Sequence, residues 1–399
     1  MTDSGRTNPA RGQGRLGIWL VGARGSVGAT TVVGVLAVRA RLAPSTGLVS
    51  ELPEVACAGL PGLDRVVLGG HDLGDESLAK RAERLASGGV LPAGLLPLVA
   101  EELAAVDGRL RPGYHRETGE PQAAAVDRLQ RDLEEFRAEN GLAHVVVVDV
   151  ASTEAPVPTE ALTEGPLVDV EALDRALAAG EAPLPASSAY VLAAYRAGCP
   201  VVSFTPSPGP RLPVLEEVAR RQGLPWAGSD GKTGETLLKA TLAPMFATRA
   251  LHVGSWASYN MLGGGDGATL ADPERAASKL ATKARGLEAI LGHPVEGPMH
   301  IDYVADHGEV KTAVDHVSFE GFLGARMSLQ FTWTGYDSAL AAPLVVDLAR
   351  LVLRAREVGE TGPLPLGFFF KDPAGSTEHR LSAQWDALVA WCARLGEGA

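Results

Sequence analysis

The chain has 399 residues, of which 46% are hydrophobic and 21% are charged, values typical of one large or two ordinary globular domains. Its net charge of −12 argues against nucleic acid as a general partner, and no apolar run approaches the roughly 20 residues that span a bilayer. Cys57, Cys199 and Cys392 are far apart, which predicts no disulfide framework and a reducing compartment. We therefore expect a soluble, cytoplasmic protein without a membrane partner.

The N-terminal region contains a tail and then a strand-turn-helix pattern. Residues 1–14 are polar and predict a disordered tail. The apolar run of residues 16–21 predicts a buried strand, and an apolar helix follows at residues 29–41. Between them stands the glycine turn Gly22-Ala23-Arg24-Gly25-Ser26-Val27-Gly28. This order is typical of a dinucleotide-binding fold, although the spacing G-x-x-G-x-x-G also fits a turn that merely packs a strand on a helix.

A second strand, at residues 65–73, ends in an acidic residue. Asp72 could accept hydrogen bonds from ribose hydroxyls, although a helix N-cap is the alternative interpretation. Glu51 follows a weaker strand and ranks second for the same role. His71, next to Asp72, receives no chemical role.

Residues 145–150 form the strongest strand pattern in the chain and indicate a central parallel strand. Ala151, Ser152 and Thr153 follow it, and Thr205 follows the next strand, at residues 200–204. Strands and helices alternate up to this point. The expected fold is therefore a Rossmann-type α/β domain, a doubly wound parallel sheet covered on both faces.

Two dense polar loops follow, at residues 228–236 and 258–267. Their glycines let backbone N–H groups approach a ligand, and Lys279 and Lys283 would share one helix face after the second loop. Two like charges at this spacing are unfavourable unless an anion lies between them. Surface loops with a solvated lysine face are the alternative. A P-loop is disfavoured because Trp226 stands where that motif, read back from Lys232, requires glycine.

The pattern changes in the last third of the chain. Residues 299–304 and 326–333 alternate polar and apolar side chains, which predicts a half-buried antiparallel sheet. Residues 338–357 predict a long apolar helix. We expect a nucleotide-binding domain at 15–236, an inserted α+β domain at 237–340, and a segment at 341–399 that rejoins the first domain.

Six motifs, in this order, resemble those of the myo-inositol-1-phosphate synthase family. They are Asp230-Gly-Lys-Thr-Gly-Glu-Thr236, Ser258-Tyr-Asn-x-Leu-Gly-x-x-Asp-Gly267, Ser278-Lys279-x-x-x-Lys283, Gly308-Glu-Val-Lys311, Asp337-Ser-x-Leu-Ala-Ala-Pro343 and Phe370-Lys-Asp-Pro373. The resemblance spans roughly residues 16–373. It implies that the inserted domain is catalytic and that the chain assembles through this domain into a homotetramer.

The resemblance also implies a reaction, in which a hexose 6-phosphate is cyclised with NAD as a recycled cofactor. The catalytic residues that it implies are Lys279, Lys283, Lys311, Lys371, Asp230 and Asp337. The cofactor-binding residues are Gly22, Ala23, Arg24, Gly25, Ser26, Val27, Gly28, Asp72, Ala151, Ser152, Thr153, Thr205, Asp230, Thr233, Gly265, Asp266, Asp337 and Ser338. The substrate-binding residues are Asn260, Gly234, Thr236 and Lys283, and no metal ligands are expected.

Some positions depart from the family pattern. Gly264 and Gly265 stand where the family commonly has two asparagines, and Arg24 and Ser26 stand where eukaryotic members have Gly and Asn. Glucose 6-phosphate, giving myo-inositol 1-phosphate, is the first expectation for the substrate. Fructose 6-phosphate, closing a five-membered cyclitol phosphate for carbocyclic nucleoside biosynthesis, is the alternative within the family. An ordinary NAD-dependent dehydrogenase and a non-catalytic NAD-binding protein are alternatives from other classes.

Overall fold

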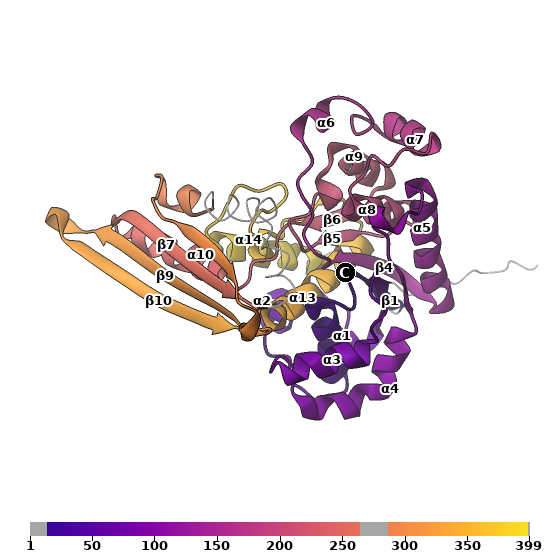
Figure 1. The fold of residues 1–399 in the computed structure, drawn as a ribbon, viewed down its shortest axis with the longest axis horizontal. Coiled ribbons are helices and arrows are strands. Elements are labelled where there is room, and N and C mark those ends of the chain that lie inside the picture. The colour runs from indigo at the N-terminus through magenta and orange to yellow at the C-terminus, as the bar shows by residue number, and fades with distance from the viewer. Residues whose placement is uncertain (1–13, 264–285, 398–399) are drawn as a thin grey trace, which may run out of the picture.

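The computed structural model describes residues 14–263 and 286–397, and these residues form two separate β-sheets (Figure 1). The larger sheet has seven strands in the order β11-β6-β5-β4-β1-β2-β3, and every neighbouring pair is parallel. The strands are β1 (Arg15–Val21), β2 (Val66–Asp72), β3 (Leu110–Pro112), β4 (Leu142–Asp149), β5 (Val201–Ser203), β6 (Pro225–Gly228) and β11 (Gly362–Pro363).

The central strands are apolar on both faces, because helices cover the sheet on both sides. In β4, Val146 and Val148 pack into one hydrophobic cluster, whereas Val145 and Val147 pack into the other. The first face is covered by α1 (Ser26–Arg39), α3 (Leu78–Ser87), α4 (Leu96–Asp107), α13 (Asp337–Val358) and α14 (Leu381–Glu397). The second is covered by α5 (Gln122–Glu139), α7 (Val170–Ala178), α8 (Ala186–Arg196) and α9 (Pro213–Gln222). The doubly wound parallel sheet is confirmed.

The smaller sheet extends away from the larger one as a long arm, with α10 (Gly234–Thr248) along one side (Figure 1). Its strand order is β10-β9-β7-β8, with β7 (His252–Leu262), β8 (Met299–Tyr303), β9 (Lys311–Glu320) and β10 (Arg326–Gly335). Phe246 of α10 packs against Trp256 and Val317 on the inner face of the sheet. The expected boundaries at residues 236 and 340 fall within the first turns of α10 and α13.

The structure corrects two sequence predictions in this sheet. Residues 258–262, predicted as a polar loop, belong to β7, where Ser258 and Asn260 point inward and are buried. The prediction was wrong because polar side chains on the inner face of a sheet give the same sequence pattern as a loop. Of the two strands predicted to be antiparallel, β10 does pair antiparallel with its neighbour β9, but β8 pairs with β7 in parallel. A long connection precedes β8, and such a connection lets a strand return in the same direction.

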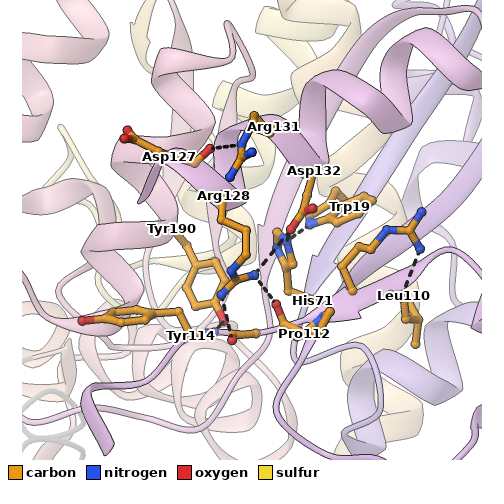
Figure 2. A network of polar contacts seen from close by, with 12 residues as sticks. Trp19, His71, Leu110, Pro112, Tyr114, Asp127, Arg128, Arg131, Asp132 and Tyr190 are labelled. Carbon is orange, nitrogen blue, oxygen red and sulfur yellow. Dashed lines mark hydrogen bonds and ion pairs between the residues drawn. The ribbon is translucent and has the colours of Figure 1, made fainter. Parts of the chain in front are cut away.

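A buried network around His71 braces the carboxyl ends of β2 and β3 (Figure 2). Trp19 Nε1 donates to His71 Nδ1 at 2.8 Å, so the proton on Nε2 faces Asp132 Oδ2 at 3.0 Å. Arg128 Nη1 lies 3.5 Å from the same carboxylate and donates to the carbonyl of Pro112. Burial lowers the pKa of His71 and so favours its neutral form in the folded protein.

We expect His71→Asn to destabilise the protein by about 2 kcal/mol, because it leaves the buried Trp19 N–H and the Asp132 carboxylate poorly paired. The unfolded imidazole binds a proton below its ordinary pKa of 6.5, while the folded one resists it. The stability of the unmodified protein should therefore fall as the pH drops below 6.5, and His71→Asn should lose that component. Urea unfolding at several pH values measures both effects. The exposed His316→Asn should show neither, and an unchanged stability of His71→Asn would contradict the role of the network.

Candidate active site

A cavity of about 870 Å³ lies where the carboxyl ends of β1, β2, β4 and β5 meet the inserted sheet. Most of the predicted site residues that the structure describes line it. They are Gly22, Arg24, Gly25, Ser26, Val27, Asp72, Ala151, Ser152, Thr153, Thr205, Asp230, Thr233, Thr236, Asn260, Lys311, Asp337, Ser338 and Lys371. Ala23, Gly28 and Gly234 do not line it. Gly265, Asp266, Lys279 and Lys283 lie outside the described residues, as does Gly264.

The glycine turn brings the chain from β1 to α1 in close contact with its neighbours. Gly22 has φ +85°, and its N–H donates to the carbonyl of His71 at 2.9 Å. A Cβ on Gly28 would lie 2.6 Å from the carbonyl oxygens of Gly22 and Ala23. Gly28 thus permits close packing of helix against turn. The N-cap of α1 is Gly25, which has no side chain to cap the first N–H groups of the helix. Such a helix start suits a pyrophosphate.

Asp72 lies at the end of β2 with its carboxylate fixed by two backbone donors. The N–H groups of Arg24 and Gly74 each donate to it at 2.7 Å. This arrangement leaves acceptor capacity for ribose hydroxyls at the edge of the cavity. Glu51, the rival acid, does not line the cavity; it pairs with Arg350 of α13.

Asp149, at the end of β4, was not singled out from the sequence. It lines the cavity while only 4% exposed, and burial raises its pKa to about 7. The N–H of Ala151 donates to it at 3.0 Å. A carboxyl group that is partly protonated near neutral pH could both donate and accept hydrogen bonds at the cofactor side of the cavity.

Two lysines reach the cavity, each against a carboxylate. Lys311 Nζ lies 2.8 Å from Asp337 Oδ2, and Lys371 Nζ lies 2.8 Å from Asp230 Oδ1. Lys311 begins β9, whereas Asp337 begins α13. The amines of two segments that are remote in sequence therefore converge on one cavity.

Backbone pairing explains how Lys371 arrives from the far end of the chain. The N–H of Lys371 donates to the carbonyl of Asp230 at 2.7 Å, and the N–H of Lys232 donates to the carbonyl of Phe369 at 2.8 Å. Ser229 and Asp372 exchange hydrogen bonds in the same ribbon. The polar loop after β6 is thus held as one strand of a short two-stranded ribbon.

The N-termini of two helices lie at the cavity and favour the binding of an anion there. Thr233 is the N-cap of the 15-residue helix α10, yet its side chain makes no capping hydrogen bond. Thr233 and Thr236 both line the cavity, next to the unsatisfied N–H groups of this helix start. The start of α13 lies at the same cavity. A phosphate group would find N–H donors and lysine cations together here.

Asn260 supplies the clearest indication of a bound polar molecule. It is 1% exposed and lines the cavity, yet among the described residues neither its amide nitrogen nor its amide oxygen has a hydrogen-bond partner. Buried amide groups without partners are rare in native proteins. A hydroxylated ligand in the cavity would satisfy both atoms.

Ser258, two residues before Asn260 on the same face of β7, belongs to a buried polar cluster that the sequence did not reveal. Lys239 lies 2.5 Å from Glu235 and donates to Ser258 at 2.7 Å, and Ser258 donates to Asp315 at 2.6 Å. Burial raises the pKa of Asp315. The i,i+4 spacing of Glu235 and Lys239 was the available signal, but such pairs usually lie on helix surfaces.

Lys232 was also not assigned a role from the sequence. It is 5% exposed, and its amine donates to Gln384 and to the carbonyl of Gly367. Burial, with a smaller contribution from Lys371, lowers its pKa to about 7. Lys232 is thus part of the ribbon that carries Lys371, but its side chain extends to Gln384 and does not line the cavity.

Among the described residues, no group of three or more His, Cys, Asp or Glu side chains could hold a metal ion. In the same part of the chain, no helix is sufficiently long and apolar to cross a bilayer. The cysteines are free thiols.

Sequence comparison matches residues 16–393 to the family described as myo-inositol-1-phosphate synthase with an NAD-binding domain. A curated relative, inositol-3-phosphate synthase 1 of Bacteroides thetaiotaomicron, is 30% identical over 410 aligned positions. The alignment covers 95% of this chain and 93% of that protein.

Solved structures have a similar fold. Inositol-3-phosphate synthase of Caenorhabditis elegans gives a TM-score of 0.82 at 21% identity and covers 96% of this chain and 86% of its own. A myo-inositol-1-phosphate synthase-related protein of Thermotoga maritima gives a TM-score of 0.74 at 23% identity, over 95% of this chain and 98% of its own. At these identities the likeness shows the fold alone.

Proposed function

The chain belongs to the myo-inositol-1-phosphate synthase family, and from this membership we propose that it cyclises glucose 6-phosphate to myo-inositol 1-phosphate. Enzymes of this family are NAD-dependent intramolecular isomerases. The glycine turn, Asp72 and the start of α1, whose N-cap is a glycine, fit the dinucleotide.

One observation carries the proposal: two lysine–carboxylate pairs, an open helix start and the unpartnered amide of Asn260 line the same cavity as the glycine turn. A sugar phosphate needs cations and N–H donors for its phosphate, and polar groups for its hydroxyls. The cavity offers both beside the dinucleotide site.

When bound, NAD+ supplies an acceptor for the hydride of the sugar C5 and returns that hydride at the end of the cycle. Lys311 and Lys371 place fixed positive charge near the C5 oxygen, which is negative as alkoxide and as enolate, and near the carbonyl oxygen that gains negative charge in the aldol step. Asp337 and Asp230 orient these amines, and the start of α10 holds the phosphate. Asn260 hydrogen-bonds a hydroxyl of the open-chain sugar, which helps to hold C6 within reach of the carbonyl carbon in the aldol step.

Fructose 6-phosphate remains the second candidate, because the same oxidation and C6 attack would close a five-membered ring. Phosphorus and carbon NMR of the protein with NAD+ and either 13C-labelled sugar phosphate distinguishes the two substrates. A six-membered product from glucose 6-phosphate supports the proposal. A five-membered product from fructose 6-phosphate replaces it with the alternative. Stoichiometric NADH release, without a cyclic product, would indicate an ordinary dehydrogenase instead.

We propose a cytoplasmic homotetramer assembled through the inserted domain. Exposed large apolar side chains concentrate there: Met245, Tyr259, Tyr303, Phe322, Leu323 and Met327 are six of the eleven among the described residues. Phe322 and Leu323, at the tip between β9 and β10, are 88% and 90% exposed. Apolar side chains at such a tip are typical of an interface with a second copy of the chain.

We expect the double substitution Phe322→Ser and Leu323→Ser to shift the protein toward smaller assemblies, because it removes apolar contacts between copies. The thermal stability of the single chain should change little, since both side chains lie outside its core. Light scattering after size-exclusion chromatography measures the mass. Leu98→Ser, at an exposed position on α4, is the control and should leave the assembly intact. A monomeric unmodified protein, or an intact assembly of the double variant, would contradict this interface.

A further inference from the structure

A residue of the inserted domain contacts the start of the cofactor loop's helix. Ser26, the first residue of α1, donates its hydroxyl to Glu309 Oε2 at 3.0 Å. Glu309 lies between the short helix at Ala305–His307 and β9, two residues before Lys311. Arg81, from α3, donates to Ser26 Oγ and lies 3.4 Å from Glu309 Oε1. These three side chains, from three remote segments, all line the cavity.

The donors of Arg81 are only partly used. Its Nε–H is buried and has no hydrogen-bond partner within residues 14–263 and 286–397, and the side chain is 17% exposed. An arginine has five N–H donors in a planar fork that matches phosphate oxygens. A buried donor without an acceptor is unfavourable, so an additional anionic acceptor beside Ser26 would stabilise this side chain.

We propose that Arg81 binds the pyrophosphate of the dinucleotide, and that Glu309 occupies part of this anion site until the cofactor enters. The inference rests on the dinucleotide-binding part of the proposed function and is independent of the sugar. The carboxylate and the pyrophosphate are both anions that use Ser26, Arg81 and the start of α1. Two such anions repel each other at close range, so the entering cofactor displaces Glu309.

Displacement of Glu309 by the cofactor links cofactor binding to β9, the strand that begins at Lys311. Val310 alone separates Glu309 from Lys311, which pairs with Asp337. Displacement of Glu309 would therefore move a side chain two residues away from Lys311. Because the Glu309 carboxylate competes with the pyrophosphate for Ser26 and Arg81, a change that removes its charge should tighten binding of the cofactor.

The test compares binding of NAD+, ADP-ribose and adenosine by isothermal titration calorimetry to the unmodified protein, Arg81→Met and Glu309→Gln. Arg81→Met should weaken NAD+ and ADP-ribose about tenfold or more, while adenosine, which has no phosphate, should change less than about twofold. Glu309→Gln should tighten both diphosphates about threefold or more. Lys80→Met removes an exposed cation from the same helix and should leave all three ligands unchanged.

The outcomes separate the inference from the proposed function. Failure of the unmodified protein to bind NAD+ would reject the dinucleotide site itself. Normal NAD+ affinity in Arg81→Met, or an equal loss of adenosine, would overturn the pyrophosphate role, since the first shows no contact and the second a structural effect. Weaker diphosphate binding in Glu309→Gln would overturn displacement, because Glu309 would then support Arg81 rather than compete for it.

Discussion

Replacing Lys311 with alanine is expected to abolish cyclisation, by at least about a thousandfold, while the affinity for NAD+ stays within about twofold. Lys311 lines the cavity against Asp337, at the start of the strand that also carries Ala313 and Asp315 on its inner face. Its charge would stabilise oxygens that become negative only during the reaction. Loss of that charge should therefore lower kcat much more than it weakens binding of the cofactor.

Single-turnover formation of the cyclic product, with NAD+ binding measured in parallel, tests this expectation. Asp337→Asn keeps the lysine but removes its carboxylate partner, and should cause a smaller loss of turnover. Lys80→Ala, at an exposed position outside the cavity, should retain full turnover. Near-normal product formation by Lys311→Ala would refute the assigned role.

The doubly wound sheet was predictable because its signals are local. The strand at residues 16–21, the glycine turn and the helix after it are adjacent in sequence, and the run at residues 145–150 is apolar because both its faces are buried. The resemblance also selected residues from remote segments that the structure brings to one cavity, such as Asp230 and Lys371. Backbone pairing that joins residues 229–232 to 369–372 has no periodic signature in either segment.

The missed residues lacked a local signal for a physical reason. Asp149 continues an apolar strand, and only the burial of the strand's end makes its carboxyl group unusual. Arg81 stands in a helix rich in charged residues, where most side chains face solvent. Its contacts with Ser26 and Glu309 depend on how α3 and the inserted domain meet across the glycine turn. Ser258 and Asn260 lie in a strand, but their sequence pattern predicts a loop, because polar side chains on an inner sheet face are uncommon.

Lys232→Met should remove most of the rise in the free energy of unfolding that the unmodified protein shows as the pH increases into the alkaline range. Burial lowers the pKa of this amine from 10.5 to about 7, so between these pH values the unfolded lysine binds a proton that the folded lysine does not. The free energy of unfolding therefore rises with pH across this window, by at most about 5 kcal/mol. A methionine cannot titrate, and the rise should disappear. It also leaves Gln384 and the carbonyl of Gly367 without their donor, which should lower stability above pH 7.

Denaturant unfolding of both proteins between pH 6.5 and 9.5 measures the difference. Burial raises the pKa of the Cys199 thiol to about 12, so the stability of both proteins also falls at high pH. The effect of Lys232 is therefore read from the difference between the unmodified protein and Lys232→Met. The exposed Lys80→Met should keep the full rise. If the rise persists in Lys232→Met, the amine is charged in the folded protein, and a fixed cation then belongs to the ribbon that carries Lys371. If the rise is lost, the ribbon is supported by a neutral amine at alkaline pH, and the charge beside the substrate comes from the lysines of the cavity themselves.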